Sequence, residues 1–429
     1  MDQTNCVLML NLPPGALGGI DLLSFTTTDR FHGVKNIPAG WHFVFAASNA
    51  SLSIRHGAWF HVPSIPNTPQ ILIKKWDSQS EDFIAETSEP ELLRWKANLG
   101  TIWKEGLTPY RQSVDKDSDG EAKEESLDWG TLTSHLTPAL LSRLTGESKD
   151  HWSLTSASSA AQDLEDIPGL VKNTGFEHAE KELRFLPINL KRTWREGATG
   201  RERTEAARDR SWALGELVEH HCTGSTVRER EAQILGELQF CFLMVLTLNN
   251  NSCLEQWKRV LTLLFTCREA VRERTWLFLD ALKLLAVQLD HCKDSEGSLF
   301  DVKEDGGGFL KPLLQKFRKG LEEFGEGEWK VDVMDEIDEF QDRVKEEYGW
   351  ELDDSFVKRG MLELEDGEQV EMDVGGVDED EETGEYAPMV VELTADQLRE
   401  LDGAVNGEVD DEAVMGDEAE DVDDMDMRF

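Results

Sequence analysis

Short apolar runs separated by Gly and Pro dominate the first 150 residues. Trp41, Phe43 and Phe45 alternate with smaller or polar positions, which is the pattern of a strand buried on one face. Other short apolar runs are bounded by turn residues in the same way. These runs lie at 7–12, 20–25, 52–54, 58–62 and 71–76. We predict a β-rich N-terminal domain over residues 1–150.

A helical period appears first at about 89–103 and then throughout the second half of the chain. Leu92, Trp95, Leu99 and Trp103 recur every three or four residues, which places them on one helix face. Beyond residue 167 the same spacing recurs in several segments, and the segment at 234–248 is apolar on nearly every face. We therefore predict an all-α domain over 167–352, with 234–248 as its central helix. A capping-box pattern at Ser252–Glu255 predicts the start of the following helix.

The residues between these two regions differ from both. The stretch 153–161 (SLTSASSAA) is small and polar and has no hydrophobic period. We therefore predict a linker over 151–166. Its serines would then be accessible to kinases, and phosphate could change the spacing of the domains. These serines are Ser153, Ser156, Ser158 and Ser159.

Acidic residues are concentrated at the C-terminal end. The chain has 44 basic and 86 acidic residues and a formal net charge of −42, and residues 361–429 hold 27 of the acids but only two bases. Such composition is typical of a solvated, disordered tail, which we predict over 353–429. The negative charge argues against a nucleic-acid partner and favours basic protein surfaces. The fold class that follows is α+β, with a β-rich domain, a helical domain and a disordered acidic tail.

The cysteines and the apolar runs indicate an intracellular protein. The six cysteines include no C-x-x-C pair, and the N-terminal stretch has no basic region before its short apolar run. The most apolar run, Phe240–Leu248, has nine residues, fewer than the roughly twenty that span a bilayer. We expect six reduced thiols, no membrane segment, and a cytoplasmic and nuclear location.

One motif resembles the opening of a calcium loop. Asp115, Asp117 and Asp119 occupy the first three ligand positions, and Gly120 stands at the turn position. Ser126 replaces the glutamate that would complete the coordination shell. A solvated acidic loop is the preferred interpretation, and a calcium-responsive adaptor is the alternative function.

Metal and catalytic patterns are absent from the sequence. His220–Cys222 and His291–Cys292 lack the spacing of zinc ligands, and we interpret the first group as the end of a helix. The sequence has no nucleophile elbow, phosphate-binding loop or dinucleotide motif. We expect no cofactor, no metal, no small-molecule substrate and no catalytic residue. A cryptic enzyme with a cleft between the domains stays open as a further alternative.

The tail contains an apolar island at residues 386–393. Its high β propensity suits addition of a strand to the edge of a partner sheet, because a lone strand needs a partner for its backbone groups. The residues proposed to bind are Tyr386, Met389, Val390, Val391, Glu392 and Leu393. Residues 361–374 form a rival apolar segment.

Several blocks of sequence are similar to the Aar-two family of splicing factors. The N-terminal blocks form a long signature, and two further blocks lie in the helical half. They are 12–15 (LPPG), 19–22 (GIDL), 31–44 (FHGVKNIPAGWHFV), 235–242 (LGELQFCF) and 254–258 (LEQWK). Their order and spacing cover roughly the first 350 residues.

The resemblance implies a non-catalytic assembly factor of the U5 snRNP. Members of this family bind the large U5 scaffold protein through its RNase H-like and MPN-like domains before the helicase joins. In the family, a C-terminal tail strand can clamp those two domains together, and residues 386–393 match that role best. An acidic chaperone of this kind would also cover surfaces that later hold RNA.

Overall fold

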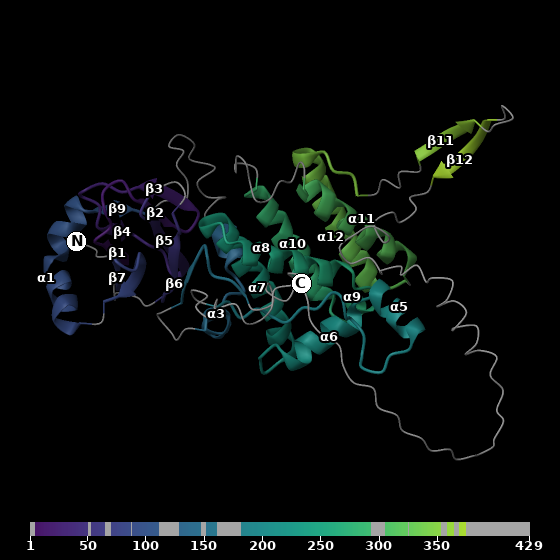
Figure 1. Ribbon diagram of the computed structural model, residues 1–429, viewed down its shortest axis with the longest axis horizontal. Coiled ribbons are helices and arrows are strands. Elements are labelled where there is room, and N and C mark those ends of the chain that lie inside the picture. The colour runs from purple at the N-terminus through teal and green to yellow at the C-terminus, as the bar shows by residue number, and fades with distance from the viewer. Residues whose placement is uncertain are drawn as a thin grey trace, which may run out of the picture. The chain divides into compact units, whose positions relative to one another are not determined.

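The computed structural model describes most of the chain up to residue 352 and one hairpin beyond it. The described residues are 5–49, 53–64, 70–86, 88–110, 128–146, 152–160, 182–292, 305–324, 326–352, 358–363 and 369–374. The chain divides into two compact units, Met1–Ser355 and Phe356–Phe429. The first unit holds both the β-rich and the helical region (Figure 1).

Two five-stranded sheets form the N-terminal region. The first has the order β8-β7-β1-β4-β9, in which β1 runs parallel to β7 and β4 runs parallel to β9. Its strands are β1 (Cys6–Leu10), β4 (Gly33–Lys35), β7 (Ile71–Asp77), β8 (Asp82–Ala85) and β9 (Leu107–Pro109). The second has the order β10-β6-β5-β2-β3. Its strands are β2 (Leu17–Ile20), β3 (Leu23–Thr26), β5 (Gly40–Ala47), β6 (His56–Val62) and β10 (Ser153–Thr155).

Helix α1 (Glu89–Glu105) confirms the helix predicted at about 89–103 from apolar residues three or four positions apart. It packs on the outer face of the first sheet, where Leu99 is buried with Leu8 and Ile73. In Figure 1 the layers follow one another as α1, the first sheet, the second sheet and the helical region. Each sheet therefore has cover on both faces.

Strand β5 is buried on both faces, so the prediction of a half-buried strand was wrong. Val44 and Ala46 lie in the core between the two sheets. Phe43 and Phe45, on the opposite face, belong to the core of the helical region. The predicted single strand at 20–25 is also wrong, because Asp21 adopts a positive φ of 55° and the chain turns back there from β2 into β3.

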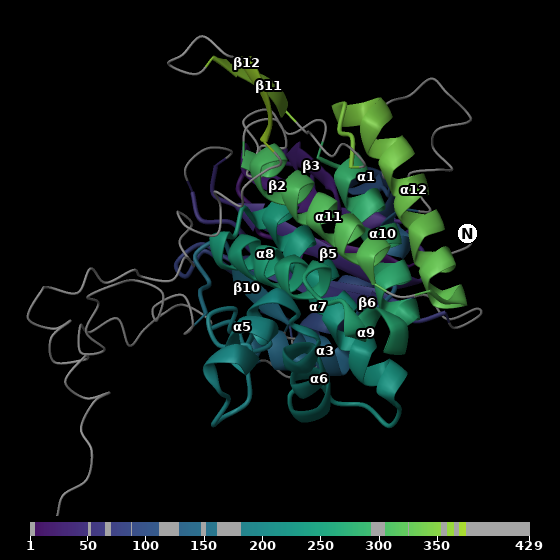
Figure 2. The ribbon, with the colours of Figure 1, turned by 90° about the vertical axis from the view of Figure 1, so that its right-hand side faces the viewer.

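The helical region is built around α7 (Val227–Leu248), as predicted (Figure 2). This helix is long and apolar enough to cross a membrane, yet 83% of its most apolar window is buried inside the protein. The other helices whose bounds are described are α3 (Pro138–Thr145), α5 (Gly200–Arg208), α6 (Ser211–His220), α8 (Asn251–Phe265), α9 (Glu269–Glu273), α10 (Thr275–Asp290), α11 (Asp305–Glu323) and α12 (Glu328–Tyr348).

The turn between α7 and α8 uses three consecutive asparagines. Asn249, with φ 62°, ends α7 in the left-handed conformation. Asn250 then caps α8, because its side chain accepts a hydrogen bond from the amide of Cys253 at 2.9 Å. The predicted capping box at Ser252 was therefore wrong, and α8 begins one residue before it.

The predicted linker is in part a strand of the second sheet. Ser153–Thr155 forms β10, which pairs antiparallel with residues 56–58 of β6. Ser153 is 8% exposed and Ser158 is 2% exposed. The expectation of an accessible serine linker was therefore wrong for these two residues, and Ser156 and Ser159 are only partly exposed. The rest of the predicted linker, 161–166, lies outside the described residues.

The second unit contains one described hairpin. Strands β11 (Lys358–Glu363) and β12 (Gln369–Val374) pair antiparallel, with Lys358 opposite Val374 and Glu363 opposite Gln369. They coincide with the apolar segment 361–374 of the predicted tail. The island at 386–393 lies outside the described residues.

Candidate interaction site

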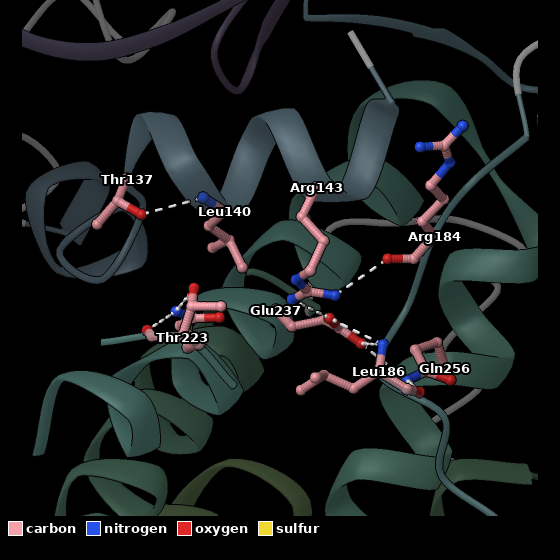
Figure 3. A network of polar contacts seen from close by, with 9 residues as sticks. Thr137, Leu140, Arg143, Arg184, Leu186, Thr223, Glu237 and Gln256 are labelled. Carbon is pink, nitrogen blue, oxygen red and sulfur yellow. Dashed lines mark hydrogen bonds and ion pairs between the residues drawn. The ribbon is translucent and has the colours of Figure 1, made fainter. Parts of the chain in front are cut away.

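A network of buried polar contacts lies at the middle of α7, where the sequence is LGELQF. It belongs to the first unit, Met1–Ser355, which we call the body. Glu237 is fully buried, and its carboxylate accepts hydrogen bonds from three different residues (Figure 3). Arg143 of α3 donates to its Oε2 at 2.7 Å, and the amide of Leu186 donates to its Oε1 at 2.9 Å. Gln256 of α8 donates to the same Oε1 at 2.8 Å. One carboxylate thus joins α3, α7, α8 and the extended segment at Leu186.

The same arginine and glutamine extend this network to the backbone. Arg143 also donates to the carbonyl of Arg184 at 3.0 Å, and Gln256 donates to the carbonyl of Leu186 at 3.0 Å (Figure 3). The segment at 184–186 has no regular structure to pair its own backbone groups. Side chains bind the carbonyls of Arg184 and Leu186 and the amide of Leu186, and the amide of Arg184 donates to the carbonyl of Leu144 at 2.9 Å.

Gln239 and Gly236 hold α7 against the segment that precedes α3. Gln239 accepts from the amide of His135 at 2.9 Å and donates to the carbonyl of Thr131 at 2.7 Å. A Cβ at Gly236 would lie 2.6 Å from the carbonyl oxygen of His135 and 2.5 Å from Leu140 Cδ2. Glycine at 236 therefore permits a close approach that a side chain would prevent.

Aromatic packing joins the second sheet to α7. The ring centroid of Trp59 of β6 lies 6.3 Å from that of Phe240 and 6.3 Å from that of Trp129. Asn250 adds polar contacts between the helices and the segment around β10, since its side chain donates to the carbonyls of Thr155 and Ser158 at 3.0 and 2.8 Å. The β-rich and helical regions consequently share one core, and their relative position is fixed by packing.

A second buried network lies within the N-terminal signature. His42 Nδ1 lies 2.8 Å from Asp21 Oδ2, and Tyr110 donates to the same oxygen at 2.5 Å. The amide of Phe43 donates to Asp21 Oδ1 at 2.8 Å. His42 is 1% exposed, and its Nε2 lies 3.0 Å from the carbonyl of Pro38. The arrangement fixes the β2–β3 turn against β5, and its buried His has protein partners on both ring nitrogens.

The histidine and cysteine residues considered as metal ligands or reactive groups have structural surroundings. His220 is the last residue of α6, as predicted, and it lies near Glu216 and Glu219 on the protein surface. All six cysteines are buried free thiols. Burial raises the pKa of Cys6, Cys222 and Cys292 to about 12, which keeps these thiols protonated and unreactive.

A pocket of about 250 Å³ lies between α10 and α12. Lys283 and Glu336 form an ion pair across it at 3.4 Å, and no Ser, Cys or His is among the described residues that line it. The cleft expected for a cryptic enzyme would lie between the domains, where the described residues of the sheet and of α7 are instead packed together. The calcium-like residues Asp115, Asp117 and Asp119 and their loop lie outside the described residues.

Strand edges are the features of the body suited to recognition by added strands. Among the described strands, β8 and β9 end the first sheet and β10 and β3 end the second. Ile84 of β8 is 50% exposed. An edge strand presents unpaired amides and carbonyls that another strand can bind. The proposed tail residues 386–393 lie outside the described part, so their strand role stays a prediction. Sequence reasoning missed β8, since its four residues carry only a weak alternation.

Comparison with known proteins covers both halves of the body. Residues 3–146 match the AAR2 N-terminal domain, and residues 185–353 match the AAR2 C-terminal repeat region. "Protein AAR2 homolog" of Pongo abelii is 26% identical over 343 residues, which cover 72% of this chain and 81% of that protein. The proteins of the same name from Mus musculus and Caenorhabditis elegans are 26% and 25% identical over 72% and 67% of this chain, and over 81% and 78% of their own lengths. The two matched regions contain Asp21, His42, Glu237 and Trp257 and include most of the shared core, and the chain belongs to the AAR2 family.

Proposed function

We propose that this protein is a non-catalytic assembly chaperone of the spliceosomal U5 snRNP. Its partner is the large U5 scaffold protein, which it binds through the RNase H-like and MPN-like domains. The observation that carries this proposal is the match of both AAR2 regions, in order, to one continuous body. The protein acts in the cytoplasm and the nucleus, where the particle is assembled.

The structure of the body supports a binding role. Its two regions share a core, so surfaces on the sheets and on the helices keep a fixed spacing. Two partner domains that contact these surfaces would be held in one relative orientation. Preorganisation of this kind improves affinity because little order has to be gained on binding.

The tail adds a second means of recognition. Residues Tyr386, Met389, Val390, Val391, Glu392 and Leu393 would add a strand across both partner domains, as the sequence resemblance implies. The hairpin β11–β12 is the rival segment, because a two-stranded sheet leaves two edges unpaired. The acids around both segments would repel RNA from the covered surface.

Three chains distinguish the two tail segments. They are the full chain, a chain that ends at Val374 and keeps the hairpin, and a chain that ends at Ser355, where the first unit ends. Each is mixed with the separate RNase H-like and MPN-like fragments, and the mass of each complex is measured by light scattering. Bridging of both fragments by the full chain alone would assign the clamp to residues after 374.

Other outcomes have distinct meanings. Bridging that persists in the chain ending at Val374 would assign the clamp to the hairpin, and bridging by the shortest chain would assign it to the body. If the full chain bound neither fragment, the proposed function would be wrong. A competition assay with U5 RNA and the helicase then tests the blocking role, which fails if all components bind the scaffold together.

A further inference from the structure

A groove lies between α10 and α12 on the surface of the helical region. Figure 2 shows α12 at the edge of this region, with α10 beside it. The groove contains the pocket of about 250 Å³, whose apolar lining comes from Ala286, Val287 and Phe340. Small-molecule sites usually measure roughly 300–1,000 Å³, so this smaller pocket better suits one apolar side chain of a protein partner.

An acidic stripe follows α12 beside this groove. Its five carboxylates recur every three or four residues, which places them on one face of the helix. All five are exposed, and Glu339 also lines the pocket. At 1.5 Å per residue, the stripe extends about 21 Å along the helix axis. The residues of this α12 acidic stripe are Asp332, Asp335, Glu339, Asp342 and Glu346.

The cations of α12 are bound elsewhere and do not neutralise the stripe. Arg343 lies 3.5 Å from Asp290 of α10, and Lys345 lies 2.7 Å from Glu351. Lys330 donates to a backbone carbonyl of α11 at 2.9 Å. Within the part of the chain that the structure describes, no ion pair includes a carboxylate of the stripe. Like charges at this spacing destabilise a helix, so a cationic partner would relieve a repulsion that the free protein carries.

Apolar groups accompany the carboxylates on this surface. Val331 is 58% exposed and lies one turn before Asp335 on the same face of α12. Together with the pocket beside Glu339, it places apolar contacts near both the start and the middle of the stripe. A partner that fits this surface therefore combines a row of cations with apolar residues. A basic amphipathic helix has this combination, because its Lys or Arg can recur at the spacing of the stripe.

We propose that the groove and the α12 acidic stripe bind a basic amphipathic helix of another protein. Lys or Arg of that helix face the stripe, and one of its apolar residues occupies the pocket between Val287 and Phe340. The charges speed association and select against acidic partners, while the pocket fixes the register. The proposal concerns the body alone and does not depend on the U5 scaffold protein as the partner.

Three synthetic peptides test the chemistry of the partner. The first has Arg every three or four residues, one Leu beside this row and Ala elsewhere, over about 18 residues, which covers the stripe. The second has Ala in place of the Leu, and the third has Glu in place of every Arg. Fluorescence anisotropy measures their binding to the full chain at ~0.15 M ionic strength. We expect the Leu peptide to bind about fivefold more tightly than the Ala peptide, and the Glu peptide not to bind.

Matched variants of the full chain test the place of binding. The stripe variant removes three carboxylates through Asp335→Asn, Glu339→Gln and Asp342→Asn. The control variant removes three exposed carboxylates from other parts of the body, through Glu196→Gln, Glu219→Gln and Glu273→Gln. We expect the stripe variant to weaken binding of the Leu peptide about tenfold and the control variant less than about twofold, because exposed charges act over only ~8 Å at this ionic strength. Both variants keep the acids of 361–429, so any binding of peptide to those acids is the same in each.

A further variant tests the pocket without a change in charge. Val287→Phe places a larger side chain in it, and circular dichroism checks that the helices are retained. We expect this variant to bind the Leu peptide no more tightly than the Ala peptide, and to bind the Ala peptide as the native chain does.

Three results would overturn the proposal. Equal weakening in the stripe and control variants would mean that basic peptides respond only to the net charge of the chain. Equal affinity of the Leu and Ala peptides for the native chain would mean that the pocket takes no part, and absence of binding by both would mean that the surface is not a docking site. Since no scaffold fragment is present in these assays, each of these results leaves the proposed function unaffected.

Discussion

Phe240 of α7 lies with its ring centroid 6.3 Å from that of Trp59 of β6, and both side chains are fully buried. One residue comes from the helical region and the other from the second sheet. Their contact lies in a core to which both regions contribute. Unfolding of one region should therefore destabilise the other, so that the two regions unfold together.

Replacement of Phe240 by Ala tests this coupling. We expect the free energy of unfolding to fall by about 3–5 kcal/mol, because the substitution leaves a cavity in a closely packed core. Helical circular dichroism and tryptophan fluorescence should shift to lower urea together. Leu93→Ala is the control, since Leu93 is 66% exposed, and it should change stability by less than about 0.5 kcal/mol. Two separate transitions in Phe240→Ala would contradict a shared core.

Glu237→Ala should destabilise the protein through its buried network. It removes one acceptor from Arg143, from the amide of Leu186 and from Gln256, and removal of one partner from a buried pair costs about 3–5 kcal/mol. Urea denaturation measures the change. Glu219→Ala, on the exposed face of α6, is the control and should be nearly neutral.

The coupling between Glu237 and Arg143 can be measured separately. Glu237→Gln, Arg143→Met and the double variant form a cycle, and we expect a coupling energy of about 0.5–3 kcal/mol. Additive effects of the two substitutions would mean that the 2.7 Å contact contributes little beyond its separate parts.

Gly236→Ala should destabilise the protein, while Gly215→Ala should stabilise it. A Cβ at 236 would lie 2.6 Å from a backbone carbonyl that cannot move freely, and overpacking of this kind costs about 1–3 kcal/mol. A Cβ at Gly215 in α6 would meet no atom of the described residues within 4 Å, so Ala should add about 0.5–1 kcal/mol through helix propensity. Thermal unfolding of the two variants checks both signs, and equal destabilisation would refute the close approach at 236.

The pKa of Cys6 predicts a loss of stability in alkali. Burial raises this pKa from 9.0 to about 12 in the folded protein. A group whose pKa is higher when folded contributes stability that is full below pH 9 and is lost as the pH rises toward 12. The difference in unfolding free energy between the native chain and Cys6→Ala should therefore shrink between pH 8 and pH 10. A difference that stays constant would contradict the shifted pKa.

The elements that the sequence predicts well are those whose pattern depends on one partner surface. Helix α1 lies with one face on a sheet, so its spacing of three and four residues is visible in Leu92, Trp95 and Leu99. The central place of α7 also follows from its composition, because a helix that is apolar all round has to be surrounded.

The elements that the sequence predicts poorly depend on long-range contacts. Ser153, Thr155 and Ser158 look like a linker because they are small and polar, yet pairing with β6 and hydrogen bonds from Asn250 satisfy their backbone inside the protein. Both partners are distant in sequence, at residues 56–58 and 250. Likewise Glu237 and Gln239 lie on an apolar helix, and nothing local to them predicts that backbone groups near 131, 135 and 186 need their side chains.

Strand β10 also has a consequence for synthesis of the protein on the ribosome. The strands up to β9 emerge first, but β6 gains its second neighbour only when residue 155 is available, and Trp59 is covered only after Phe240 has emerged. The strand edge stays open during the translation of about 90 residues and the aromatic surface during about 180, and both can associate with other nascent chains in that time. The growing polypeptide therefore depends on cellular holdases for longer than a self-contained β domain would, and expression of residues 1–150 alone should yield aggregated protein.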